Sequence, residues 1–263
     1  MTIMQAFWLG LVQGLGEFLP ISSTGHLDLL QKIFGFSVGN YLTLDILLHL
    51  GTLAAVVVVY WKRLLNMILH PVKSELWLLV VATIPAVIVS LLFDIDFSPE
   101  ALGFEFLITT LILWLADLVG GVSFQTKEVK WYNAVLMGFM QALAILPGVS
   151  RSGATISGGV ATGLSRKRAA DFAFLMSVPA ILGAIVLEFI KNGSDIFSGV
   201  MVESMGGWQP LVVGIFTSAV FGFLAIKFML SIVRRVRLTW FGVYTALLGI
   251  AILLDQYVFR KFF

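Results

Sequence analysis

The chain has 263 residues, of which 59% are hydrophobic and only 12% charged, and its formal net charge is +2. Soluble domains are roughly 45–50% apolar and about 25% charged, so this composition predicts an all-α, polytopic membrane protein. The small net charge, without a long basic run, argues against a nucleic-acid partner. The absence of cysteine excludes disulfides, zinc–thiolate sites and cysteine nucleophiles.

The first region of the chain is apolar but broken. Residues 3–19 stop at Pro20, and the apolar piece that follows, Leu27–Phe36, is too short to cross a bilayer, which takes ~20 mostly apolar residues. We therefore expect two half-helices joined at a polar break, forming a re-entrant hairpin. Such backbone is tolerated at membrane depth only where protein buries it or where it lines a wet cavity. A pair of surface amphipathic helices is the alternative.

A second broken region occurs later in the chain. Its apolar stretch, residues 131–146, stops at Pro147 and is followed by a Gly-rich piece, residues 154–164. We expect it to form a second hairpin. Six other stretches are long enough to be predicted as spanning helices: Tyr41–Trp61, Leu76–Phe93, Phe104–Phe124, Ala169–Ile190, Pro210–Leu230 and Leu238–Tyr257.

The two broken regions resemble each other in sequence. "LGLVQGLGEFLPISSTG" (9–25) aligns with "MGFMQALAILPGVSRSG" (137–153) if one deletion and one insertion are allowed near the proline. Three identical pairs stand 128 positions apart: Gln13 and Gln141, Ser22 and Ser150, and Gly25 and Gly153. We interpret residues 1–126 and 127–263 as two repeats within a single membrane domain. Because each repeat has three crossings, the second enters the membrane inverted, and such repeats place their site where the broken helices meet.

The basic residues are distributed as this topology requires. If the N-terminus lies outside, most of the 17 lysines and arginines face the cytoplasm, in agreement with the positive-inside rule. The cytoplasmic set is Lys62, Arg63, Lys73, Lys127, Lys130, Arg166, Lys167, Arg168, Arg234, Arg235 and Arg237, whereas the acidic segment 94–100 falls outside. The first hairpin would then open to the external side and the second to the cytoplasmic side.

The first break gathers ionisable and polar side chains. Gln13 and Glu17 are four residues apart and share one helix face. An ionisable residue inside a membrane segment is costly and marks function by default, so Glu17 is the strongest candidate, the alternative being a structural ion pair with Arg151. Beside it, His26 is a candidate acid or base, although an isolated histidine on an apolar helix is more often structural.

Both breaks are followed by helix starts rich in hydroxyls. Serine and threonine are good N-caps, and the free N–H groups of a helix start favour anions. The second break adds Arg151, whose guanidinium binds phosphate oxygens bidentately. Together these features predict a phosphate pocket, although capping alone would explain the serines. The candidate binding residues are Gln13, Ser22, Thr24, Gly25, Ser150, Ser152, Gly153 and Thr155.

Other polar features have weaker interpretations. Asp45 and His49 form a second pair at four-residue spacing on a predicted spanning helix. They would either support the site from behind or lie at a helix interface, and the interface is favoured. The basic run "SRKRAAD" (165–171) is interpreted as a topology anchor, with binding of anionic lipid headgroups as the alternative.

Two ordered motifs resemble the undecaprenyl-diphosphate phosphatase family, which is known for conferring bacitracin resistance. They are "QGLGEFLPISSTGH" (13–26) and "PGVSRSGAT" (147–155), and the resemblance in length and hydrophobic layout covers essentially the whole chain. The first motif position holds Gln13, where some members have glutamate. That leaves one carboxylate where those members have two, which argues against a mechanism that needs a glutamate pair.

The resemblance implies a multi-pass enzyme of the bacterial plasma (inner) membrane. It would hydrolyse undecaprenyl diphosphate to the monophosphate carrier lipid and inorganic phosphate for peptidoglycan synthesis, at a site facing the external, periplasmic side. It also implies dependence on a divalent cation, Mg²⁺ or Ca²⁺. A lipid-phosphate flippase or another transporter is the alternative function, because inverted repeats with broken helices are common in transporters. The oligomeric state, a homodimer included, stays open.

The roles expected at the site follow from this chemistry. Arg151, with the hydroxyls of the second break, would hold the diphosphate and neutralise developing charge. Glu17 would either coordinate the cation or act as a base. Ser23 is the candidate nucleophile with His26 as its proton acceptor, and direct attack by water activated by His26 or Glu17 is the alternative.

Overall fold

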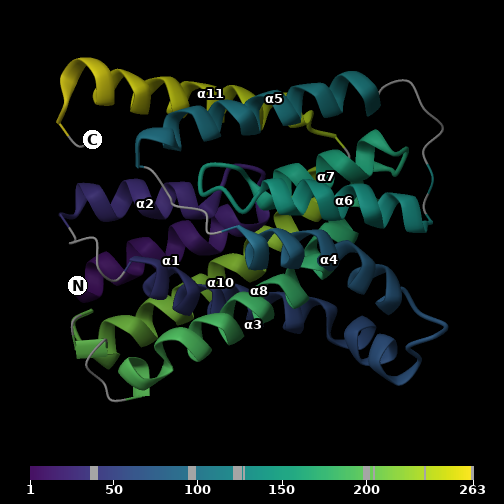
Figure 1. Cartoon of the computed structure of the whole chain (residues 1–263), viewed down its shortest axis with the longest axis horizontal. Helices are drawn as coiled ribbons and strands as arrows, with labels where there is room; N and C mark the ends of the chain where they lie inside the picture. The colour runs from purple at the N-terminus through teal and green to yellow at the C-terminus, as the bar shows by residue number, and fades with distance from the viewer. Residues whose placement is uncertain are drawn as a thin grey trace.

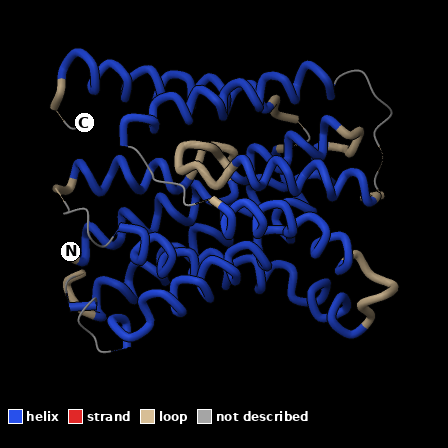
Figure 2. The backbone as a smooth tube through the Cα atoms, viewed as in Figure 1, coloured by secondary structure: helices blue, strands red, loops and turns tan. Residues whose placement is uncertain are grey.

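The computed structural model describes residues 1–35, 41–93, 99–120, 126, 128–197, 202–203, 205–233 and 235–261. Every named element within these ranges is helical (Figure 2). In chain order they are α1 (Ile3–Phe18), α2 (Ser23–Ile33), α3 (Tyr41–Leu69), α4 (Leu76–Leu92), η2 (Pro99–Ala101), α5 (Leu102–Gly120), α6 (Trp131–Leu143), α7 (Arg151–Ala161), α8 (Arg166–Phe197), α10 (Trp208–Ile232), α11 (Leu238–Leu254) and η3 (Asp255–Phe259). Several sequence predictions concern residues outside the described ranges: Phe36, most of the acidic segment 94–100, positions 121–124 of the third span, Lys127 and Arg234.

Both predicted breaks are present and fall next to the prolines. Helix α1 begins with a capping box, in which Thr2 and Gln5 exchange side-chain hydrogen bonds with each other's backbone N–H. It ends at Leu19, whose backbone is extended (φ −79°, ψ 146°), because the residue before a proline is disfavoured in the helical region. The first half-helix therefore ends where Pro20 requires.

The second half-helices start earlier than hydrophobicity alone predicts. Helix α2 begins at Ser23 and α7 at Arg151, rather than at residues 27 and 154. Ser22 and Ser150 cap these helices by accepting hydrogen bonds from the backbone N–H groups of Gly25 (3.2 Å) and Gly153 (3.0 Å). A polar N-cap and first turn are part of the helix but are invisible to an apolar-run criterion.

All six predicted spanning stretches contain helices, and five described segments are long and apolar enough to cross a membrane. They are Thr43–Leu69, Leu102–Gly120, Arg166–Ile190, Trp208–Ile232 and Leu238–Phe259. The sixth, α4, is an apolar helix of 17 residues. Helices α3 and α8 extend beyond their predicted cores, α3 as far as Leu69 and α8 from Arg166 to Phe197. The prediction of six crossings therefore requires that α4, despite its shorter length, also spans the membrane.

The two broken regions approach each other from opposite sides of the molecule. In Figure 1, α1 and α2 lie at the left and α6 and α7 at the right, and the loops that join each pair lie near the middle (Figure 2). Along one flank α5 packs on α11, and α3 packs on α10 and α8 on the other. The longer helices thus surround the place where the two breaks meet.

Each hairpin is anchored by a close helix crossing with the other half of the chain. Helix α1 packs on α10, and α6 packs on α4. At the first crossing, a Cβ on Gly14 would lie 2.7 Å from the Ser218 carbonyl oxygen. At the second, a Cβ on Gly138 would meet the Ala82 carbonyl oxygen at 2.5 Å. Small residues let helix backbones approach closely, so these crossings fix where the two breaks meet.

The start of α8 is tied down by ion pairs. Arg168 contacts Glu75 and also Asp171 (2.8 Å), and Arg166 pairs with Asp117 at 2.7 Å. Arg166 and Arg168 therefore link α8 to the end of α5 and the start of α4. Both belong to the run 165–171, whose role as a topology anchor stays a prediction.

Candidate active site at the meeting of the two breaks

The two break loops hold each other through reciprocal hydrogen bonds. Ser22 Oγ donates to the Pro147 carbonyl, and Ser152 Oγ donates to the Leu19 carbonyl at 2.8 Å. Ser22 adopts a positive φ of 66°, a conformation that non-glycine residues take only when their surroundings impose it. The local backbone at the first break is thus shaped by its contact with the second.

Helix α5 supports the second break from behind. The Gly148 N–H donates to Glu105 Oε2 at 2.7 Å, and its carbonyl accepts from Thr109 Oγ1 at 2.9 Å. Thr109 Oγ1 in turn accepts from the Ser150 N–H at 2.9 Å. These buried groups satisfy backbone polar atoms that a loop at this depth would otherwise leave unpaired.

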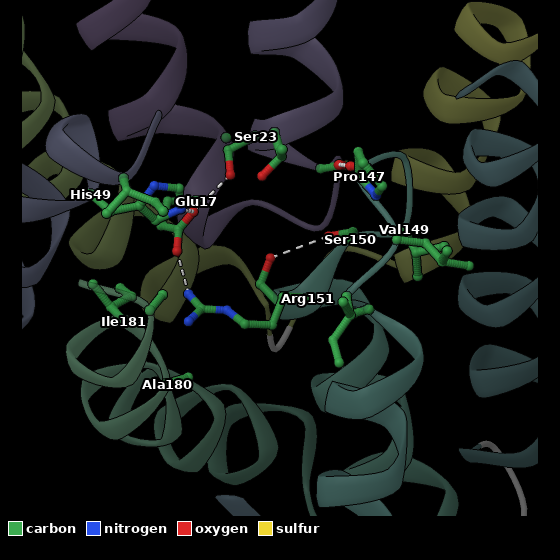
Figure 3. A pocket seen from close by; sticks show the side chains of 18 of the residues that line it. Glu17, Ser23, His49, Pro147, Val149, Ser150, Arg151, Ala180 and Ile181 are labelled. Carbon is green, nitrogen blue, oxygen red and sulfur yellow. Dashed lines mark hydrogen bonds and ion pairs between the residues drawn. The ribbon is translucent and has the colours of Figure 1, made fainter. Parts of the chain in front are cut away.

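A cavity of about 190 Å³ lies where the breaks meet. Figure 3 shows Glu17, Ser23, His49 and Arg151 converging on it from four different helices. Its lining residues are Gly16, Glu17, Ser22, Ser23, Thr24, Ile46, His49, Ala144, Ile145, Leu146, Pro147, Val149, Ser150, Arg151, Ser152, Ala180, Ile181, Ala184 and Ile185. The polar side chains of the wall therefore come from the two breaks and from His49, whereas the residues that α8 contributes are all apolar.

Glu17 is the central acceptor of this site. Its Oε1 accepts a hydrogen bond from Arg151 Nη2, and its Oε2 accepts from Ser23 Oγ (2.7 Å) and Gln13 Nε2 (3.2 Å). His49 Nε2 lies 3.3 Å from the same Oε2. Only 5% of the Glu17 side chain is exposed. The carboxylate is thus buried but surrounded by donors, the condition under which a charge is tolerated at depth.

The helix starts on either side of Glu17 have matching positions. Ser23 is the first residue of α2 and Arg151 the first residue of α7. Both helix N-termini therefore add partial positive charge to the guanidinium of Arg151. A guanidinium carries five N–H donors, so Arg151 can hold Glu17 and an anion together. The arrangement suits a phosphate group with a hydroxyl and its proton acceptor alongside.

The other predicted binding residues divide into two groups. Ser22, Thr24, Ser150 and Ser152 line the cavity. The remaining four are not among its lining residues. Gln13 supports Glu17, and Thr155 Oγ1 bonds back to the Arg151 carbonyl (2.8 Å), whereas Gly25 and Gly153 allow close packing on Phe106 and Pro20.

His26 does not join this group. Its Nδ1 lies 2.6 Å from the Ser22 carbonyl oxygen, and its Nε2 lies 2.6 Å from the hydroxyl of Tyr244. The ring stacks on that tyrosine, with centroids 5.6 Å apart, and it does not line the cavity. Since a carbonyl can only accept, Nδ1 carries a proton and donates it to Ser22, and Nε2 shares a hydrogen bond with the Tyr244 hydroxyl. Both imidazole nitrogens are therefore engaged away from Ser23.

His49 is the histidine that reaches the site. From the sequence, His49 was paired with Asp45, and a position at a helix interface was favoured over a role at the site. The spacing of residues along α3 does not show which face of this helix meets α1. Its position on an apolar helix four residues from a carboxylate was the available signal.

The described side chains around the cavity do not by themselves form a cation site. Both carboxylate oxygens of Glu17 are engaged by protein donors, and no cluster of three His, Asp or Glu suited to a metal occurs in the described part of the chain. Mg²⁺ and Ca²⁺ require several oxygen ligands. The dependence on a divalent cation stays a prediction.

Comparison with known proteins identifies the family. The family model of the bacitracin resistance protein BacA matches residues 6–251. An undecaprenyl-diphosphatase of Carboxydothermus hydrogenoformans is 43% identical over 264 residues, covering 97% of this chain and 98% of the relative. Undecaprenyl-diphosphatase 3 of Bacillus cereus (98% of each chain) and the undecaprenyl-diphosphatase of Moorella thermoacetica (100% and 98%) are each 41% identical. The family expected from the two motifs is thus confirmed, and this chain belongs to the BacA family of bacitracin resistance proteins.

Proposed function

We propose that this protein is an integral-membrane phosphatase that hydrolyses undecaprenyl diphosphate to undecaprenyl phosphate and inorganic phosphate. The observation that carries the proposal is the contact of Ser23 and Arg151 with one buried carboxylate, Glu17, between two helix starts. The relatives' names favour this reaction over the transporter alternative. The product would serve as carrier lipid for peptidoglycan synthesis.

The geometry supports a covalent route. Ser23 Oγ attacks the terminal phosphorus while its proton passes to Glu17 Oε2, which lies 2.7 Å away. The phosphoanhydride bond breaks, and undecaprenyl phosphate leaves with the bonding electron pair and takes the proton from Glu17, which becomes a carboxylate again. In the second step water attacks the phosphoserine and gives a proton to Glu17. The bond between phosphorus and Ser23 Oγ breaks, inorganic phosphate departs, and Glu17 passes its proton to the serine oxygen. The covalent intermediate thus splits one difficult hydrolysis into two displacements.

Arg151 and the two helix starts stabilise the charge that develops in the transition state. Phosphoryl transfer is catalysed mainly by positioning and by neutralising charge on the phosphoryl oxygens. We assign that role to the guanidinium of Arg151 on the cavity wall and to the N-terminus of α7, where this residue stands. Glu17, rather than His26, is assigned as the proton acceptor, because the imidazole of His26 is bonded to Ser22 and Tyr244.

The membrane arrangement is part of the same proposal. The two broken regions would be re-entrant hairpins in inverted repeats, with α4 as a sixth crossing. Support comes from matching packing pairs: α1 on α10 corresponds to α6 on α4, and α5–α11 and α3–α8 are pairs of equivalent helices. With the basic residues placed in the cytoplasm of a bacterial cell, the site in the plasma membrane opens outward. The apolar wall of Ile46, Ile181 and Ile185 would accompany the first prenyl units.

The test is a product assay with purified protein in lipid vesicles. Wild-type protein should convert the C55 diphosphate to monophosphate and release an equal amount of inorganic phosphate. Glu17→Gln should lose at least about a hundredfold in kcat, the usual size of a general-base contribution. Movement of the lipid between leaflets without phosphate release would favour the transporter instead.

A further inference from the structure

The two nitrogens of His49 face acceptors of different kinds. Nδ1 lies 2.6 Å from the backbone carbonyl oxygen of Asp45, one turn earlier in α3. Nε2 lies 3.3 Å from Glu17 Oε2 in α1. A carbonyl oxygen can only accept, so Nδ1 must carry a proton. The imidazole is thereby oriented by its own helix, with Nε2 aimed at the carboxylate.

The second nitrogen must also carry a proton. Glu17 accepts hydrogen bonds from the guanidinium of Arg151 and from Gln13 Nε2, and both of these nitrogen groups can only donate. It is therefore present as a carboxylate. An Nε2 lone pair facing a carboxylate oxygen at 3.3 Å would be repulsive, whereas an Nε2–H group makes the contact attractive. His49 is accordingly an imidazolium that donates from both nitrogens.

We propose that His49 is a positioning residue for the reaction, acting through Glu17. This inference rests on the proposed phosphatase function. By donating to Oε2, His49 holds that oxygen toward Ser23 Oγ, whereas the Arg151 contact on Oε1 draws the other end of the carboxylate toward the second break. The two cations therefore fix the orientation of the carboxylate, with Oε2 facing Ser23.

The proton balance of the reaction is unchanged by this role. The proton that Glu17 receives comes from Ser23 in the first displacement and from water in the second. The Nε2 proton of His49 stays on the ring throughout. His49 fixes which carboxylate oxygen faces the nucleophile, and it lines the cavity without contributing an atom to the bonds that form or break.

The opposing interpretation is that His49 matters only to α3. Its Nδ1 contact with Asp45 lies within one helix, and its backbone carbonyl accepts from Thr52 Oγ1 at 3.0 Å. Two substitutions separate the interpretations. In His49→Gln an amide N–H replaces the donor near the Nε2 position, and in His49→Asn one replaces the donor near Nδ1.

The experiment measures kcat and KM for the C55 diphosphate in both variants, with His70→Gln as the matched control. His70 is an exposed histidine just beyond the end of α3. His49→Gln and the control should stay within about threefold of wild type. His49→Asn should lose about tenfold or more in kcat with a smaller change in KM, as expected when a charge-assisted hydrogen bond to the working carboxylate is removed.

Three results would overturn the proposal: kcat kept in His49→Asn and lost in His49→Gln, kcat kept in both, or kcat lost equally in both. Thermal melting reports whether each variant folds. Histidine ¹⁵N spectra of the wild-type protein provide a second test that needs no stable variant. They should contain an imidazole with both nitrogens protonated that is missing in His49→Gln, and its absence from the wild type would contradict the proposal. Ser23→Ala and Glu17→Gln run in parallel: if they keep full turnover, the proposed function fails, whatever His49 does.

Discussion

Arg151 donates a hydrogen bond to Glu17 across 134 positions of sequence. The contact forms because each break loop is tied to the other, by Ser22 to the Pro147 carbonyl and by Ser152 to the Leu19 carbonyl. An ion pair of this kind at depth would be costly if either partner were removed. It therefore joins the two halves of the chain at the same point where the chemistry is assigned.

The covalent route predicts a phosphoserine at Ser23. With substrate labelled in its terminal phosphate, acid quenching during turnover should trap label on the protein, and peptide mapping should place it in residues 16–26. Ser23→Ala should abolish trapping and lower kcat at least about a hundredfold. Ser231→Ala, at an exposed serine of α10, serves as the control and should behave as wild type. Undiminished turnover in Ser23→Ala would indicate direct attack by water.

The α1–α10 crossing predicts unequal effects of two glycine substitutions. Gly14→Ala introduces a Cβ 2.7 Å from the Ser218 carbonyl oxygen and 2.8 Å from the Gly222 nitrogen, so it should destabilise the protein by about 1–3 kcal/mol. Gly183→Ala is the matched control, because its Cβ would meet no atom within 4 Å. Melting temperatures in detergent should fall for the first variant only. A crossing loose enough to accept Gly14→Ala without a shift would contradict the described packing.

Cation dependence can be separated from cation binding. Phosphate release should stop in EDTA and return with Mg²⁺ or Ca²⁺, as the family resemblance implies. Substrate-free protein should show no saturable, stoichiometric binding of radioactive Ca²⁺ at the site, since Glu17 is fully engaged and its neighbours at the cavity are cations or hydroxyls. Tight stoichiometric binding that Glu17→Gln abolishes would show that the side chains rearrange to form a metal site.

The outward orientation predicts which surface positions react from outside the cell. Because the chain has no cysteine, single introduced cysteines report unambiguously. Lys261→Cys, at an exposed position beyond the end of the last predicted span, should react with a membrane-impermeant maleimide in intact spheroplasts. Val72→Cys, 89% exposed, should react only after the membrane is permeabilised. The reverse pattern would place the opening of the first hairpin on the cytoplasmic side.

Sequence predicted the parts of the structure that local chemistry determines. Pro20 and Pro147 end the first half-helices, and serine caps start the second ones, so the two breaks could be located without coordinates. An ion pair of Glu17 with Arg151 was the structural alternative to a functional role for Glu17, and the two side chains are in contact. These inferences needed only proline geometry, capping and the cost of burying charge.

Orientation about helix axes could not be predicted in the same way. His26 stands in the motif next to Ser23, yet its ring turns toward Tyr244, 218 positions away. His49 belongs to no motif, yet the rotation of α3 brings it to Glu17. Spacing within a helix fixes which residues share a face, but the partner of that face depends on contacts between distant segments.

The most direct test of the central claim is inorganic phosphate release from the C55 diphosphate by purified wild-type protein and by Arg151→Ala. Lys62→Ala, at an exposed position of α3, is the control. The wild type and control should release phosphate at equal rates, and Arg151→Ala should be slower by about 10²–10³-fold, as when a donor that neutralises transition-state charge is removed. Wild-type protein that releases no phosphate, or a folded Arg151→Ala variant that releases it as fast as the control, would contradict a phosphatase site at the meeting of the two breaks.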